Sequence, residues 1–177
     1  MMQLAINASG ARAVPTIAHD TGVAVSATWG GGFDSRVLWV DQSSRPWLEI
    51  TFDPADGAIH RCVIHRFPAS TRTGTDAKSS RRDSAVRVHL ERGAQVDATG
   101  ELVPRRELVV ADPDSIATPT GVELWIGPRS EADVQLIQNG PIGFFMDEDS
   151  SLLGVRADWE AVAPQFAPER RPPSTLA

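Results

Sequence analysis

The sequence predicts an all-β protein: an antiparallel sandwich, or a strongly bent sheet that partly closes into a barrel, with little helix. Short segments alternate between apolar and polar residues, with the period of two expected of strands that bury one face. Gly, Pro, Asp and Asn separate these segments, as they do in turns. Helical character is confined to residues 158–163, where Asp158 is a candidate N-cap and Pro164 ends the segment.

About ten or eleven short strands are expected along the chain. The clearest is 48–52, in which three apolar residues alternate with two polar ones. The others are 23–29, 37–40, 59–63, 86–90, 108–110, 122–126, 134–137, 142–146 and 152–155. Trp39 and Trp125 each lie inside one of these apolar segments, so both are expected in the core.

Three turns connect these strands in specific ways. Asp-Pro-Ala-Asp-Gly at 53–57 is typical of a hairpin loop, because Pro pre-sets the first turn residue and Gly suits the left-handed position. Asn139-Gly140 predicts a tight hairpin, although Pro141 would be awkward inside a following strand. The acidic run at 147–151 turns 142–146 back into 152–157.

The chain is expected to form one domain over residues 1–163, with a faint internal repeat. When Asp53 is placed on Asp147, the possible halves 22–67 and 107–158 align. Their apolar positions then coincide at Leu48/Ile142, Ile50/Phe144, Phe52/Met146 and Ile59/Leu153. Residues 68–84 are rich in Ser, Thr, Gly and Arg and are expected to be a mobile loop, while 164–177 form a disordered Pro-rich tail.

Composition and motifs exclude several classes of protein. No apolar run is long enough for a transmembrane helix, and the N-terminus lacks the basic region of a signal peptide. Cys62 is the single cysteine and is expected to be a buried strand residue, so the protein is expected to be cytoplasmic. The net charge of −6 argues against nucleic-acid binding. The Gly-rich phosphate motifs and the Gly-x-Ser-x-Gly elbow are absent from the sequence.

The charge is unevenly distributed along the chain. Residues 61–92 hold eight basic and three acidic residues, a net charge of +5, and residues 107–160 hold two basic and eleven acidic residues, a net charge of −9. One interpretation is that the two segments pair as neighbouring strands and partly neutralise each other. The other is an exposed acidic surface that binds a basic protein partner. Its candidate residues are Glu123, Glu131, Asp133, Asp147, Glu148 and Asp149.

Two hairpins carry a resemblance to a known class of proteins. They are the strand–Asp-Pro-x-x-Gly–strand unit at 48–63 and Phe-Phe-Met-Asp-x-x-x-x-Leu-Leu-Gly-Val at 144–155. Together they resemble small acidic all-β bacterial proteins of the polymorphic-toxin immunity type. That resemblance implies a non-catalytic inhibitor that blocks a basic toxin through an acidic surface.

Two alternatives remain open from the sequence. The first is a small-ligand-binding β-barrel with Trp29 and Trp47 at its mouth and Arg72, Arg81 and Arg82 on a mobile lid. The second is an enzyme that uses His60 or His89 with nearby carboxylates, and a cluster that holds both histidines would require their strands to pair. No metal or cofactor is expected, because the acidic turn at 147–149 lacks the spacing of an EF-hand. The oligomeric state stays open.

Overall fold

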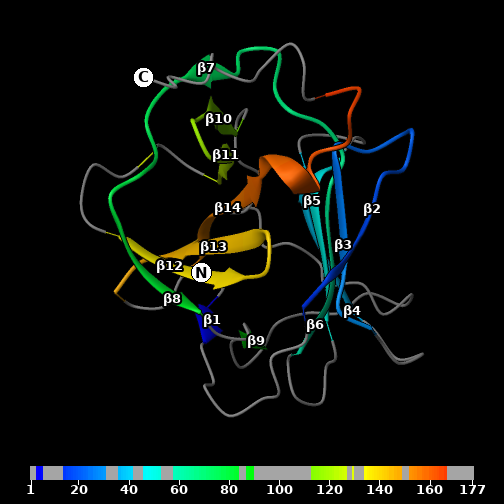
Figure 1. Ribbon diagram of the computed structural model, residues 1–177. Helices are drawn as coiled ribbons and strands as arrows, with labels where there is room; N and C mark the ends of the chain where they lie inside the picture. The colour runs from blue at the N-terminus through cyan, green and yellow to red at the C-terminus, as the bar shows by residue number, and fades with distance from the viewer. Residues whose placement is uncertain are drawn as a thin grey trace.

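The computed structural model consists almost entirely of strands, and this confirms the all-β prediction. It describes residues 3–5, 14–30, 36–41, 46–52, 58–83, 87–89, 113–126, 129, 134–148 and 152–166. Two large sheets face each other and bury one main core between them, so the architecture is a sandwich (Figure 1). Within the described ranges, neither sheet closes on itself into a barrel.

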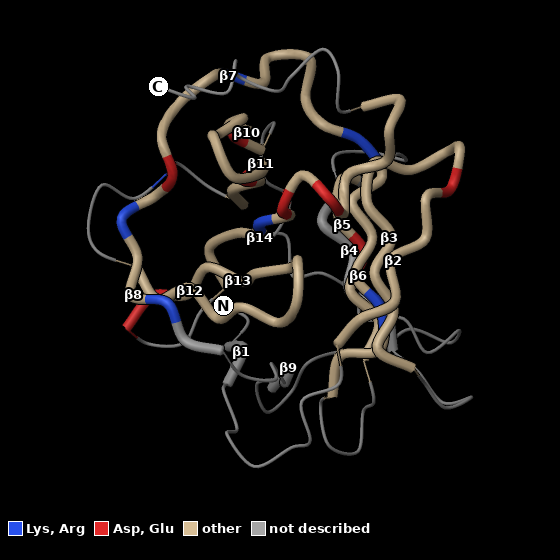
Figure 2. Tube along the Cα trace, viewed as in Figure 1, with Lys and Arg blue, Asp and Glu red and all other residues tan. Residues whose placement is uncertain are grey.

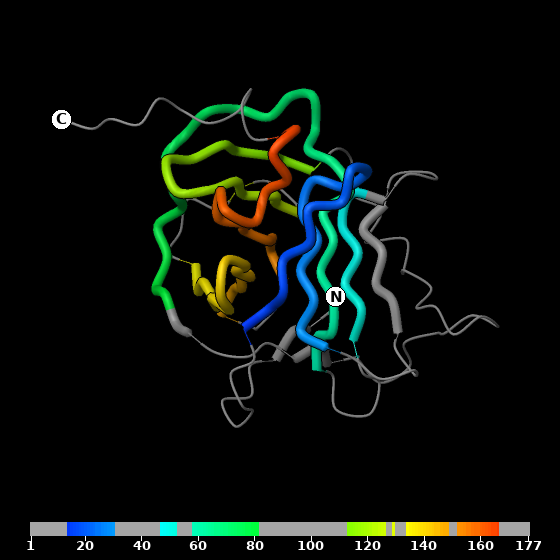
Figure 3. Tube along the Cα trace, turned by 45° about the vertical axis from the view of Figure 1, so that its right-hand side comes forward, coloured from blue at the N-terminus to red at the C-terminus, as the bar shows by residue number. Residues whose placement is uncertain are grey.

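The first sheet has five strands in the order β2-β3-β6-β5-β4, and every neighbouring pair is antiparallel. They are β2 (Thr16–Ala18), β3 (Val25–Thr28), β4 (Arg36–Asp41), β5 (Pro46–Phe52) and β6 (Ile59–Ile64). Figure 3 shows β2, β3, β6 and β5 side by side, in colours from blue to cyan-green. The predicted alternation is present, since Leu48, Ile50 and Phe52 all face the core.

The second sheet has seven strands in the order β7-β10-β11-β14-β13-β12-β8. They are β7 (Arg72–Thr73), β8 (Ser79–Asp83), β10 (Asp114–Ala117), β11 (Gly121–Trp125), β12 (Val134–Asn139), β13 (Ile142–Met146) and β14 (Leu152–Asp158). The five central strands are antiparallel, whereas the two edge strands β7 and β8 join in parallel. Gly140 and Pro141 form the turn between β12 and β13, and Gly140 has φ of 58°. Pro141 therefore lies in the turn and interrupts no strand.

Three short elements complete the described chain. A small separate sheet pairs β1 (Gln3–Ala5) with β9 (Arg87–His89). The segment expected to be helical forms one turn of 3-10 helix, η2 (Trp159–Ala161). Asp158 occupies its N-cap position, but its carboxylate makes no capping hydrogen bond and instead accepts one from Nε of Arg156 at 3.2 Å.

The two sheets share one topology. The order β2-β3-β6-β5-β4 matches β10-β11-β14-β13-β12 strand for strand, with the same antiparallel directions. A register shift interrupts β5–β6 between Thr51 and Phe52, and the same shift interrupts β13–β14 between Phe145 and Met146. A duplicated unit would give this correspondence, and the repeat itself stays a prediction.

The repeat differs from the sequence alignment at two points. Phe52 pairs with Ile59 and Met146 pairs with Leu152, so Leu152 rather than Leu153 is the counterpart of Ile59. The second hairpin loop is one residue shorter, which shifts the alignment after the turn. The tryptophans Trp39 and Trp125 lie on β4 and β11, which are not corresponding strands.

Residues 72–83, which we call the strap, differ most from expectation. The expected mobile loop 68–84 contains β7 at one edge of the seven-stranded sheet and β8 at the other. Residues 74–78 connect these two strands. They cross the face of the sheet that points away from the main core (Figure 1), where Ala77 contacts Glu123. Its two strands pair with β10 and β12, which confirms that the basic segment 61–92 and the acidic segment 107–160 are neighbours.

Candidate functional site

Glu123 is fully buried, so its assignment to an exposed acidic surface is wrong. The alternation along β11 does turn its side chain away from the main core, but the strap covers that face. One carboxylate oxygen, Oε1, accepts a hydrogen bond from the backbone N–H of Ala77 in the strap, at 2.8 Å. The other, Oε2, accepts one from Nε1 of Trp125 at 3.1 Å and lies 3.5 Å from a guanidinium nitrogen of Arg129. The carboxylate therefore fastens the strap to the sheet.

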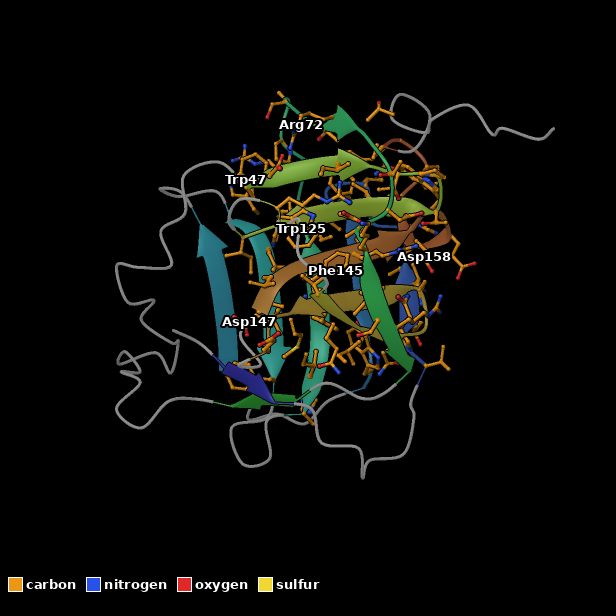
Figure 4. The ribbon with its side chains drawn as sticks, turned by 90° about the vertical axis from the view of Figure 1, so that its left-hand side faces the viewer. Trp47, Arg72, Trp125, Phe145, Asp147 and Asp158 are labelled. Atoms are coloured by element: carbon orange, nitrogen blue, oxygen red, sulfur yellow. The ribbon has the colours of Figure 1, made fainter. Side chains whose placement is uncertain are left out.

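Burial raises the pKa of Glu123 above its ordinary value. The hydrogen bonds from Ala77 and Trp125 and the positive charges of Arg129 and Arg156 act in the opposite direction. Beside this carboxylate, the Trp125 ring stacks on Phe145 with 4.5 Å between centroids. Figure 4 shows these two rings near the middle of the sheet face that the strap crosses.

A second polar group links the strap to β14. Arg156 lies directly across from Glu123 in the β11–β14 ladder, and its side chain is only 11% exposed. Its guanidinium lies 3.5 Å from Asp76 of the strap and donates to Asp158 and to the hydroxyl of Thr120. Thr120 in turn donates to Asp76. Figure 2 shows the basic and acidic residues of the strap interspersed along it.

The remaining described members of the predicted acidic surface lie at one end of the seven-stranded sheet. Asp147 is half-buried and Glu148 is exposed, directly after β13. Gln135, near the start of β12, pairs with Met146, so β12 begins beside the point where β13 ends. Figure 4 shows Asp147 at the opposite end of the sheet from Asp158. Glu131, Asp133 and Asp149 lie outside the described residues.

Trp29 and Trp47 do not form the mouth of one pocket, so this part of the ligand-barrel interpretation is wrong. Trp29 donates its backbone N–H to His60 at the start of β6, whereas Trp47 accepts from His65 just beyond its end. These points are about 17 Å apart along a strand. Trp29 packs against the main core near Phe144 (6.4 Å between ring centroids). Trp47 is adjacent to the core residue Leu48 on β5, so its side chain lies on the opposite face of the sheet.

The three arginines predicted on a mobile lid belong to the strap. Arg72 on β7 forms an ion pair with Asp114 at 2.5 Å. Arg81 is exposed on the edge strand β8, and Arg82 follows it there, with its side chain outside the described set. Arg72 thus contacts β10.

The strands of His60 and His89 do not pair, so no cluster joins these two histidines across neighbouring strands. His60 lies on β6 in the five-stranded sheet, whereas His89 lies on β9, which pairs with β1. Sequence reasoning missed a different cluster on the five-stranded sheet, in which Glu49 contacts His65 at 3.2 Å and Arg61 at 4.0 Å. The registers of β5 and β6 bring these residues to one face, and an alignment of the two alternating strands around the 53–57 turn could have found them.

No group of three or more His, Cys, Asp or Glu side chains within the described ranges is arranged to hold a metal ion. Among the same residues, no helix is long and apolar enough to cross a membrane. No protein-family model matches the chain, and no curated protein matches it in sequence.

Proposed function

We propose that this protein is a non-catalytic binding protein that captures a basic protein partner through the end of the seven-stranded sheet where β13 ends and β12 begins. We call this the acidic end. The observation that carries the proposal is the pairing of Gln135 with Met146, because it places the start of β12 beside the end of β13, which Asp147 and Glu148 follow directly. In the sequence, the acidic residues Glu131 and Asp133 precede β12, and Asp149 follows Glu148.

An immunity-like inhibitor is the form of this function that we favour. Such a protein needs no reacting groups, because it works by covering the basic site of its partner. Glu148 is exposed, and carboxylates that remain in water steer a partner of opposite charge with little desolvation cost. Burial of Glu123 beneath the strap removes it from this surface, so the proposal rests on the acidic end alone.

The double variant Asp147→Lys, Glu148→Lys tests this proposal. Tagged wild type and variant are used to capture proteins from the native lysate at low salt, and any captured basic protein is purified for titration. We expect the association rate of the variant to be at least about tenfold lower than that of wild type, because reversing exposed charges acts mainly on the association rate. Wild-type affinity should also fall steeply as salt rises.

Glu160→Lys is the matched control, because Glu160 is an exposed acid on η2, outside the acidic end. It should bind the partner as wild type does. The control changes the net charge by +2 and the double variant by +4, so a loss in the control about half that of the double variant, on a logarithmic scale, would mean that only overall net charge matters. A partner whose affinity is the same at low and high salt, or is unchanged by the double reversal, would refute binding through the acidic end.

A further inference from the structure

The strap is attached to the seven-stranded sheet mainly by polar contacts. Ala77 is its one described apolar side chain that packs on the cluster beneath, formed by Trp125, Phe145 and their neighbours. Hydrogen bonds and ion pairs make up most of its other described contacts with the sheet. Arg129 donates to the carbonyl of Thr75 at 2.8 Å, and the N–H of Gly74 donates to the carbonyl of Ala117 at 2.9 Å. A segment that buries so little apolar surface is expected to open at a lower free energy than the sandwich unfolds.

Glu123 is the acceptor at the centre of this attachment. Its carboxylate is 0% exposed and binds the N–H of Ala77. When the strap lifts, the carboxylate loses this donor and meets water. The ionisation of Glu123 and the position of the strap are therefore coupled.

Several charged groups surround this carboxylate. Arg129, beyond β11, and Arg156, on β14, face it. From the strap, Asp76 contacts Arg156, and Asp158 on β14 contacts the same guanidinium. On β10, Asp114 pairs with Arg72. These groups also contribute to strap closure, so an experiment must separate their titration from that of Glu123.

We propose that the strap is a pH-sensitive clasp: it detaches from Glu123 while the two sheets stay folded, and it detaches more often as the pH rises. Detachment would uncover the edges of β10 and β12 together with the Trp125–Phe145 stack.

The direction follows from linkage. Burial raises the pKa of Glu123 in the closed form, whereas a solvent-exposed glutamate titrates near its ordinary value. The closed form therefore holds the proton more tightly, and opening releases it at any pH between these two pKa values. Rising pH favours opening by at most about tenfold per pH unit, the limit for a single proton. Below the ordinary glutamate pKa and above the raised pKa of the closed form, the opening equilibrium no longer changes with pH.

Amide hydrogen exchange followed by NMR between about pH 4.5 and 8, corrected for intrinsic exchange rates, tests the clasp. We expect the protection of Ala77 and Gly74 to fall as pH rises, while the amides of β5 and β6 keep higher and separate protection. Glu123→Gln should abolish the pH dependence at Ala77. Glu160→Gln, which removes an exposed carboxylate on η2, should retain it.

Three results would overturn the proposal. One is protection of Ala77 that does not change with pH in the wild type. The second is a pH dependence shared equally by β5 and β6, which would mean global unfolding. The third is an unchanged slope in Glu123→Gln. If that variant does not fold, the carboxyl ¹³C shift of Glu123 in the wild type decides, because titration at the ordinary glutamate pKa would remove the coupling.

Discussion

At the residue scale, Cys62 shows how completely the main core excludes water. Its side chain is fully buried on β6, as the sequence predicted for a lone cysteine. Burial, with a smaller effect from the negative charge of Glu49, raises the pKa of the thiol to about 12. Because the thiolate is the reactive form, iodoacetamide at pH 8 should alkylate Cys62 in the native protein at least about a thousandfold more slowly than a free cysteine.

The control for this prediction is Val14→Cys in a Cys62→Ser background. Val14 is 72% exposed, so the new thiol should react at the rate of a free cysteine. Mass spectrometry of samples quenched over time gives both rates. Rapid native-state labelling of Cys62 would show that β6 opens far more readily than its burial suggests.

Gly154 is a second position where a single atom matters. It lies on β14 opposite Trp125, and a Cβ there would lie 2.5 Å from the carbonyl oxygen of Leu124 and 3.1 Å from Cα of Trp125. These are backbone atoms that cannot move aside without disturbing the ladder. Gly154→Ala should therefore lower the free energy of unfolding by about 1–3 kcal/mol, measured by urea denaturation.

Gly22→Ala is the matched substitution, because no atom lies within 4 Å of the Cβ it would add. It should leave the free energy of unfolding unchanged or slightly raised, since alanine restricts the unfolded chain. A loss in both variants would point to a general cost of removing glycine, and an unchanged Gly154→Ala would contradict the close approach of β11 and β14.

At the element scale, periodicity predicted which face of a strand a side chain occupies but not what covers that face. Glu123 alternates with Val122 and Leu124, and it does point away from the main core. It is buried nevertheless, because the strap crosses above it. The exposure of Glu123 thus depends on a segment more than 40 residues earlier in the chain, whose Ala77 donates a hydrogen bond to its carboxylate.

The strap itself carried little local signal. β7 has two residues and β8 has the polar sequence Ser-Ser-Arg-Arg-Asp, with no apolar alternation to mark a strand. Parallel pairing with β10 and β12 depends on partners far along the chain, whereas tight hairpins such as β12–β13 are specified by adjacent turn residues. Sequence therefore predicted the antiparallel hairpins and missed the two parallel edges.

At the scale of the whole molecule, both sheets contribute to one core. Ile50 on β5 and Phe144 on β13 occupy corresponding positions, and both belong to the same buried cluster. Ile50→Ala should cost about 2–5 kcal/mol and Phe144→Ala about 3–5 kcal/mol, because each leaves a cavity in shared packing. Each should shift a single unfolding transition, followed in urea by tryptophan fluorescence and by far-ultraviolet circular dichroism.

Two separated transitions, each moved by only one of the substitutions, would mean that the sheets are independent units. As a reference, Val14→Ala changes an exposed side chain and should leave the transition where it is.

The parallel edges of the strap also impose an order on folding during synthesis. Every strand partner within residues 16–64 has been made by the time β6 leaves the ribosome, so the five-stranded sheet can pair at once. The strap comes next, but Arg72 must wait for Ile116 and Ser79 must wait for Val134. β7 therefore stays unpaired until β10 has been made and β8 until β12 has been made, and during that interval the strap of the nascent chain is open to chaperones and to neighbouring chains.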